Sequence, residues 1–178
     1  MYTLQKQISI AQKSNTYFAM IFGVNSLCEC EFGSPFSHFP TQENFEVDLK
    51  NFQNWLQHDA LPEYQVLKGI KSLWFGFDFI NMDVESWDGG HNIAIAGTSN
   101  TDNYNGAVFC APGSDFLSYP LKNWYNNSPQ SEQEAVLKIG WPTYIALLLK
   151  KSQHYLSNYD ILIGPHAGEP KIKLFKNK

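Results

Sequence analysis

Arginine is absent from this 178-residue chain, so lysine supplies all of its permanent positive charge. Arginine is the side chain that most often binds phosphate groups and guanine edges through two parallel hydrogen bonds. The chain is also acidic overall, with a formal net charge of −4 at pH 7. These two features argue against a nucleic-acid-binding function, and we expect no nucleic-acid partner.

Charge of either sign is scarce. Charged residues make up 17% of the chain, against roughly 25% in an average soluble domain. Hydrophobic residues make up 43%, which is enough apolar material to build a core. A chain of this length usually folds as one unit. We therefore predict a single α+β domain over residues 1–178.

Cysteine is nearly absent, with only Cys28, Cys30 and Cys110. An odd number of cysteines does not indicate a disulfide framework. The pair Cys28-x-Cys30 has no second cysteine or histidine pair at the spacing of a zinc site. We therefore expect reduced thiols, no metal and no cofactor.

Long apolar runs are missing as well. No stretch reaches the roughly 18 apolar residues that cross a membrane, and TYIALLLKK is of a length typical of a core helix. The start, MYTLQKQISIAQKSN, lacks the basic segment and apolar run of a signal peptide. We expect a cytoplasmic protein that does not bind membranes.

The clearest helical pattern lies in residues 41–57, TQENFEVDLKNFQNWLQ. Its apolar residues recur at spacings of four, three and four, which places them on one side of a helix. They are Phe45, Leu49, Phe52 and Leu56. Thr41 is the expected N-cap of this helix, and Leu61-Pro62 is expected to end it.

Aromatic and apolar runs of strand length predict a sheet. The expected strands are residues 3–11, 16–24, 28–32 and 71–87, a hairpin within 86–116, and a C-terminal hairpin made of DILIG and KIKLF. Two further helices are expected at 130–138 and 143–156, separated by a break at Gly140-Trp141-Pro142. Gly76 is expected to mark a bulge or a close backbone approach. The predicted fold class is α+β, with a mainly antiparallel sheet flanked by about three helices in a single compact domain.

The stretch SWDGGHNIAIAGTSNTDNYNGAVFCAPGSDF, residues 86–116, reads as a hairpin. Pairing Gly97 with Gly106 aligns Ile95 with Val108 and Ile93 with Cys110. Cys110 then lies on an apolar face, as most free cysteines do. The loop NTDNYNG has oxygen ligands but not the spacing of a calcium loop, so a solvated turn is the simpler interpretation.

GGHNIAIAG resembles the histidine-bearing strand of papain-like cysteine hydrolases. In those families the nucleophilic cysteine usually precedes the histidine and begins a helix. Here Cys28 and Cys30 precede His91, but CECEFGSP does not provide the helix N-terminus that would lower a thiol pKa. No catalytic residue is therefore assigned. A small hydrolase or transferase that uses His91 with a nearby acid or cysteine stays as the alternative function.

Charge is distributed unevenly along the chain. Between Lys71 and Lys122 there are six acidic residues and no lysine, whereas seven lysines follow from Lys138 onward. Two interpretations stay open: the acidic segment is a binding surface, or the lysine-rich part neutralises it. Aromatic residues lie between the acids, as in contact surfaces for a basic protein. The predicted partner-binding residues are Asp83, Glu85, Trp87, Asp88, Asp102 and Tyr104.

The general organisation of the chain resembles the immunity proteins of bacterial polymorphic and contact-dependent toxin systems. WDGGHNIAIAG and NFEVDLKNFQNWL are the segments most similar to that group. The resemblance implies a cytosolic, non-enzymatic protein that neutralises a cognate toxin by blocking its active site. The expected partner is a basic toxin domain, and the oligomeric state is left open. An accessory protein of a phage or mobile element is a third hypothesis.

Overall fold

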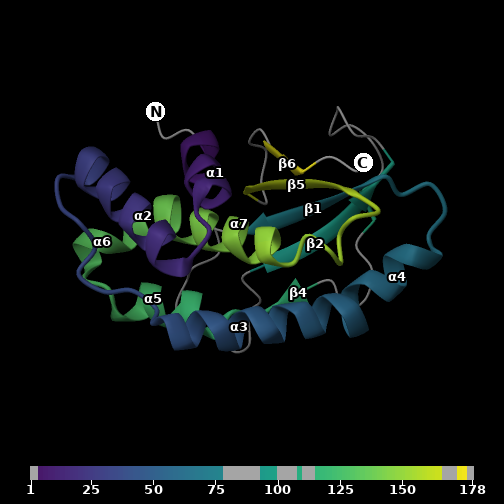
Figure 1. Ribbon diagram of the computed structural model, residues 1–178, viewed down its shortest axis with the longest axis horizontal. Helices are drawn as coiled ribbons and strands as arrows, with labels where there is room; N and C mark the ends of the chain where they lie inside the picture. Colours follow the sequence, from purple (N-terminus) through teal and green to yellow (C-terminus); the bar gives the residue numbers. More distant parts are fainter. Residues whose placement is uncertain (1–3, 78–92, 100–107, 110–114, 166–171, 176–178) are drawn as a thin grey trace. The chain divides into compact units, whose positions relative to one another are not determined.

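The computed structural model describes residues 4–77, 93–99, 108–109, 115–165 and 172–175 (Figure 1). The chain divides into two compact units. The first unit comprises Met1–Leu49 and Tyr119–Lys151, and the second comprises Lys50–Ser118 and Ser152–Lys178. Helices and a sheet are both present, which confirms the α+β class. That residues 1–178 form a single domain stays a prediction.

The second unit contains the sheet. Its described strands are β1 (Ser72–Phe77), β2 (Ile93–Thr98), β3 (Val108–Phe109), β4 (Asp115–Phe116), β5 (Asp160–Pro165) and β6 (Ile172–Phe175). Their order is β3-β2-β1-β5-β6, and β4 also pairs with β2. The neighbours are antiparallel except β1 and β5, which run parallel. The sheet is therefore mixed, and the C-terminal hairpin β5–β6 is confirmed.

Strand β1 forms the centre of this sheet, with all six of its residues buried. Gly76 pairs regularly with Ala94 of β2 and with Gly164 of β5, so it marks no bulge. A Cβ atom at this position would lie 2.7 Å from the Trp74 ring, too close for any side chain. Gly76 is therefore required by the close approach of a neighbouring indole.

Helix α3 (Gln42–Trp55) confirms the helix predicted at 41–57. Its N-cap is Thr41, whose Oγ1 accepts a hydrogen bond from the Asn44 N–H at 3.1 Å. Leu61-Pro62 does not end it, however, because a π-helical turn, η1 (Leu56–Ala60), leads directly into α4 (Leu61–Val66). Pro62 falls in the first turn of α4, directly after this π-helical turn.

The first unit is helical. Its elements are α1 (Leu4–Lys13), α2 (Tyr17–Phe32), α5 (Tyr119–Asn127), α6 (Gln130–Ala135), η2 (Val136–Gly140) and α7 (Trp141–Lys151). Helix α7 packs against both α1 and α2, and its residues 141–149 are all buried. Its first residue, Trp141, donates from Nε1 to the Leu121 carbonyl at 3.1 Å. Helix α7 is thus the core of this unit.

The strands predicted at 3–11, 16–24 and 28–32 are wrong, because residues 4–13 form helix α1 and residues 17–32 form helix α2. Local capping explains the difference. Thr16 accepts a hydrogen bond from the Ala19 N–H at 3.2 Å, and Gly33 adopts a left-handed φ of 84° while its N–H bonds the Glu29 carbonyl. These two caps define the ends of helix α2. Its apolar composition is also typical of a buried strand, which is why the sequence pattern was misleading.

The predicted break at Gly140-Trp141-Pro142 is also wrong. The π-helical turn η2 joins α6 to α7, so that the helix runs without interruption from Gln130 to Lys151. Gly140 is needed for packing, since a Cβ there would lie 2.6 Å from the Trp124 ring. The described residues form five uninterrupted helical segments instead of about three. Helix α5 was not predicted.

The predicted hairpin register is wrong too. Gly97 pairs with Phe109 and Thr98 with Val108, a shift of three positions. The prediction assumed one continuous strand opposite β2. Instead, two short strands share it, since β4 pairs with its other end through Ile93 and Phe116. His91, Gly106 and Cys110 lie outside the described residues.

No helix in the described part of the chain is both long enough and apolar enough to cross a lipid bilayer.

Replacing Phe52 by Ala should lower the free energy of unfolding by about 3–5 kcal/mol, the usual cost of truncating a buried Phe. Phe52 is fully buried, and its ring packs against Trp55, Phe75 and Phe116 at centroid distances of 5.4, 6.2 and 5.3 Å. Urea unfolding measures the change. Val47→Ala on the same helix is the control, because Val47 is exposed, and it should change stability by no more than about 0.5 kcal/mol. A Phe52→Ala loss below about 1 kcal/mol would contradict this packing.

Candidate functional site

The six predicted partner-binding residues lie outside the described residues, so their role stays a prediction. Strands β1 and β2 are antiparallel neighbours. Phe77, the last residue of β1, and Ile93, the first residue of β2, lie at the same end of this pair. The chain leaves β2 after Thr98, which pairs with Ser72 at the opposite end. The described strands therefore do not test whether the six residues form one surface.

The cysteines of CECEF lie in the last turns of α2, at the C-terminal end of the helix. Cys28 is buried, and this burial, together with the negative charge of Glu132, raises its thiol pKa to about 11. The C-terminal end of a helix is also the negative end of its dipole, which disfavours a thiolate. Cys28 therefore lacks the environment of a nucleophile, and its expected histidine partner, His91, is not among the described residues.

Ser37, His38 and Glu132 form a polar cluster at the loop before α3. Glu132 Oε2 accepts hydrogen bonds from the Ser37 N–H at 3.0 Å and from the Ser37 Oγ at 2.9 Å. Ser37 Oγ also contacts His38 Nδ1 at 2.9 Å. In a catalytic triad the carboxylate bonds the histidine, whereas here it bonds the serine. The cluster fastens the loop to α6 and has no catalytic geometry.

Within the described ranges, no group of three or more His, Cys, Asp or Glu side chains is arranged to hold a metal ion.

A buried tyrosine–carboxylate pair connects α3 with α7. The Tyr144 hydroxyl donates to Asp48 Oδ2 at 3.1 Å, and both residues are buried. Burial raises the pKa of Tyr144, and the charge and hydrogen bond of Asp48 raise it further. Tyr17 packs edge-on against Tyr144, and its pKa is also raised by burial. The pair has the chemistry of a structural contact inside the core.

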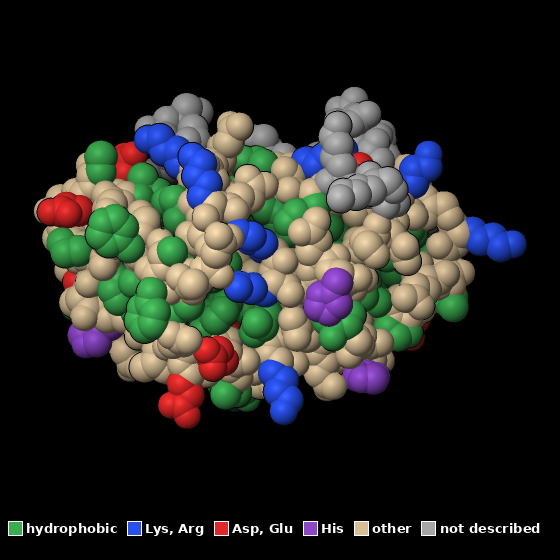
Figure 2. Space-filling model, in the orientation of Figure 1, with side chains coloured by type: hydrophobic (Ala, Val, Ile, Leu, Met, Phe, Trp, Pro, Cys, Tyr) green, Lys and Arg blue, Asp and Glu red, His purple; other side chains and the backbone are tan. Residues whose placement is uncertain are grey.

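One side of α2 carries large apolar side chains that face solvent. Phe18 is 68% exposed and Phe22 is 77% exposed, four residues apart on the same side of the helix. The opposite side is buried through Tyr17, Met20, Val24 and Cys28. Exposed hydrophobic side chains gather over α2 in Figure 2. We call this side the α2 stripe, formed by Phe18, Ala19, Phe22, Ser26, Glu29 and Cys30, which are all exposed.

Opposite charges lie at the two ends of the α2 stripe. Near its start, Lys150 Nζ bonds the carbonyls of Gln12 and Ser14 at 2.6 and 2.7 Å, and Lys151 Nζ bonds the carbonyl of Asn15 at 2.8 Å. Near its end lies Glu29, which forms no ion pair with a described residue. The start of the stripe is thus basic and its end acidic.

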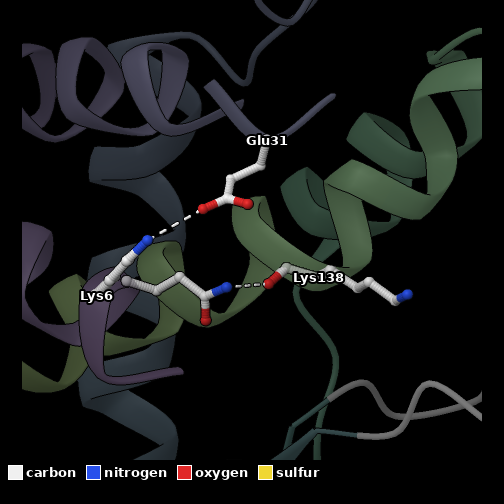
Figure 3. Close-up of polar contacts among 4 residues, drawn as sticks. Lys6, Glu31 and Lys138 are labelled. Atoms are coloured by element: carbon white, nitrogen blue, oxygen red, sulfur yellow. Dashed lines mark hydrogen bonds and ion pairs between the residues drawn. The ribbon is translucent and has the colours of Figure 1, made fainter. Parts of the chain in front are cut away.

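Glu31, the other carboxylate at the end of α2, is held on a different side of the helix. Lys6 of α1 reaches Glu31 Oε1 at 3.1 Å (Figure 3). The side-chain amide of Gln7 in α1 donates a hydrogen bond to the carbonyl of Lys138, which is labelled in the same figure. These contacts attach α1 to α2 and to η2, which leaves the α2 stripe as the open side of α2.

Sequence reasoning missed the α2 stripe because it treated residues 16–24 as a strand. The signal was present in the caps, Thr16 and Gly33, which bracket sixteen residues without a proline. Read with the helical period, Phe18 and Phe22 fall on the side away from Tyr17 and Val24.

No protein-family model, curated protein or solved structure matches this chain. The resemblance to immunity proteins therefore depends on the sequence segments alone.

In the native protein, Cys30 should react with a thiol reagent much faster than Cys28. Cys30 is exposed, whereas Cys28 is buried with a thiol pKa of about 11, so that only about one part in a thousand is thiolate near pH 8. Mass spectrometry of the labelled peptides measures each rate. Labelling in urea is the control, and there both should react at similar rates. Equal native rates would show that Cys28 is accessible and that its burial is wrong.

Tyr144→Phe should lower the free energy of unfolding by about 1–2 kcal/mol near neutral pH, because it removes a hydrogen bond to the buried Asp48. The raised pKa means that folded Tyr144 holds its proton more tightly than the unfolded chain, whose value is near 10.0. The stabilisation is present below about pH 10 and is lost as pH rises further. Urea unfolding near pH 7 and near pH 11 should show the deficit of the variant shrinking. A deficit that grows at high pH would contradict the account.

Proposed function

We propose that this protein acts by binding other protein chains, and that it is a cytoplasmic inhibitor of the immunity type that blocks a cognate toxin domain. The observation that carries the first part of the proposal, binding to other protein chains, is the exposure of Phe18 and Phe22 on α2. Neighbouring exposed aromatic side chains are costly in water and are typical of protein-contact surfaces. This cost is avoided if another protein chain covers the two side chains.

The charge pattern supports the toxin-directed form of the proposal. The chain carries net charge −4 and no arginine, and its acidic segment contains no lysine between Lys71 and Lys122. Carboxylates can occupy the place of nucleic-acid phosphates in the site of a nuclease toxin. Opposite fields also speed association. We therefore assign the toxin contact to Asp83, Glu85, Trp87, Asp88, Asp102 and Tyr104.

The test uses the protein encoded beside this chain's gene as the candidate toxin. Co-expression of this chain should restore the growth of cells that produce the toxin. The triple variant Asp83→Asn, Glu85→Gln, Asp88→Asn should slow association with the purified toxin and weaken protection, because it removes the steering charge. Trp87→Ala should instead raise the off-rate, with a loss of about 2 kcal/mol or more. Stopped-flow binding at increasing salt should show a falling on-rate for the wild type.

The matched control is Glu43→Gln, Glu46→Gln, Glu63→Gln, which removes the same number of charges from exposed positions of α3 and α4. It should keep both fast association and protection. Loss of association in both triple variants would show that only net charge matters. Equal binding by the wild type and by the variant Asp83→Asn, Glu85→Gln, Asp88→Asn would contradict the assignment of the toxin contact to the acidic segment.

A further inference from the structure

We infer that the α2 stripe is the interface between two copies of this chain, packed antiparallel about a two-fold axis that passes beside Phe22. The inference rests on the proposed function only in that both have the protein working through contacts with other chains. The toxin is assigned to the acidic segment, so the two proposals involve different residues.

The side chains of the α2 stripe fit this arrangement in size. Phe18, Phe22 and Ser26 follow each other at four-residue spacing along one side of α2. With Phe22 at the axis, Phe18 of one copy lies opposite Ser26 of the second copy, and the reverse contact is identical. An aromatic ring thus meets a small side chain at both contacts, which allows ridges to pack into grooves.

The charges fit only the antiparallel direction. Within the stripe, Phe18 and Glu29 are eleven residues or about 16 Å apart along the helix, so its two charged ends are well separated. Antiparallel packing about Phe22 brings Glu29 opposite Asn15 of the second copy, whose carbonyl holds Lys151 Nζ at 2.8 Å. Each interface would therefore contain two equivalent contacts between Glu29 and Lys151. Parallel packing would place Glu29 against Glu29 and align the two helix dipoles unfavourably.

A second copy explains more of the α2 stripe than an unrelated partner does. A partner of any kind would cover Phe18 and Phe22. A chain with the same surface accounts for the basic start and the acidic end together, because each end then meets its opposite on the second copy. A two-fold interface also closes after two copies, so the exposed aromatic side chains do not lead to an open polymer.

The first test measures the molar mass of the full chain by sedimentation and by light scattering. The wild type should be a dimer. Phe22→Glu should raise the dissociation constant by at least about thirtyfold, the effect of losing a single hot-spot side chain, because the variant dimer loses this ring from both copies. The circular dichroism spectrum should stay unchanged. Val66→Glu is the matched control, because Val66 is 75% exposed on α4, outside the stripe. It should leave the dimer intact.

The second test reverses the charges. Lys151→Glu should weaken the dimer, and adding Glu29→Lys in the same chain should restore it. A purely structural role for Lys151 at the Asn15 carbonyl would not be rescued by a change at Glu29. Rescue therefore reports contact between the two copies.

The third test uses disulfide formation. In a Cys30→Ser background, and at a protein concentration above the raised dissociation constant of the variant, Phe22→Cys should form a covalent dimer on mild oxidation because the two sulfurs face each other across the axis. Val66→Cys in the same background is the control and should not. In the wild type Cys30 should stay unlinked, whereas parallel packing would link Cys30 to Cys30.

A monomeric wild type, an absent cross-link at position 22, or a Cys30–Cys30 cross-link would each overturn the inference. The outcomes also separate it from the proposed function. A monomer that still neutralises its toxin would leave the proposed function standing without the dimer. A dimer that joins through Phe22 but neutralises no toxin would leave the inference standing and refute the proposed function.

Discussion

The burial of strand β1 is the constraint on which the second unit depends. All six of its residues are buried, so its backbone N–H and C=O groups must find partners on both edges. Strand β2 supplies one edge and β5 the other, from a part of the chain that begins at Asp160. Lys71, just before β1, joins this pairing, since its N–H bonds the Thr98 carbonyl and its carbonyl accepts from the Asp160 N–H.

A parallel pair such as β1–β5 requires a long connection between its strands. Part of that connection, Tyr119–Lys151, belongs to the first unit, where it provides the buried helix α7. The helical unit is therefore encoded by the N-terminal segment and by an excursion between two paired strands. This arrangement accounts for a sheet that is mixed and not purely antiparallel.

Local patterns predicted the elements whose periodicity is unambiguous. The stripe from Phe45 to Leu56 predicted α3, and DILIG with KIKLF predicted the terminal hairpin. The partner of β1 was beyond local patterns, because parallel pairing depends on residues far apart in the sequence. Residues 17–32 were misjudged because α2 is apolar on nearly all sides, and short apolar runs fit a buried strand as well as a helix.

The apolar composition of α2 also explains why the α2 stripe was not predicted from the sequence. A helix that is apolar on every side usually lies in a core, yet α2 buries one side and leaves Phe18 and Phe22 in solvent. Sequence alone predicted a different contact surface, the aromatic and acidic segment, whose six predicted residues lie outside the described residues, so it stays a prediction. Which side of α2 is covered depends on the packing of α1 and α7 against it, and only the fold shows this.

The central claim is that a protein chain covers the α2 stripe. Hydroxyl-radical footprinting with mass spectrometry tests it most directly, by comparing the oxidation rate of Phe18 in the wild type and in Phe22→Glu. The account predicts that Phe18 is protected in the wild type and reactive in the variant, while exposed Val66 reacts equally in both. The same high rate for Phe18 in both proteins would show that no chain covers the stripe, and it would contradict the account.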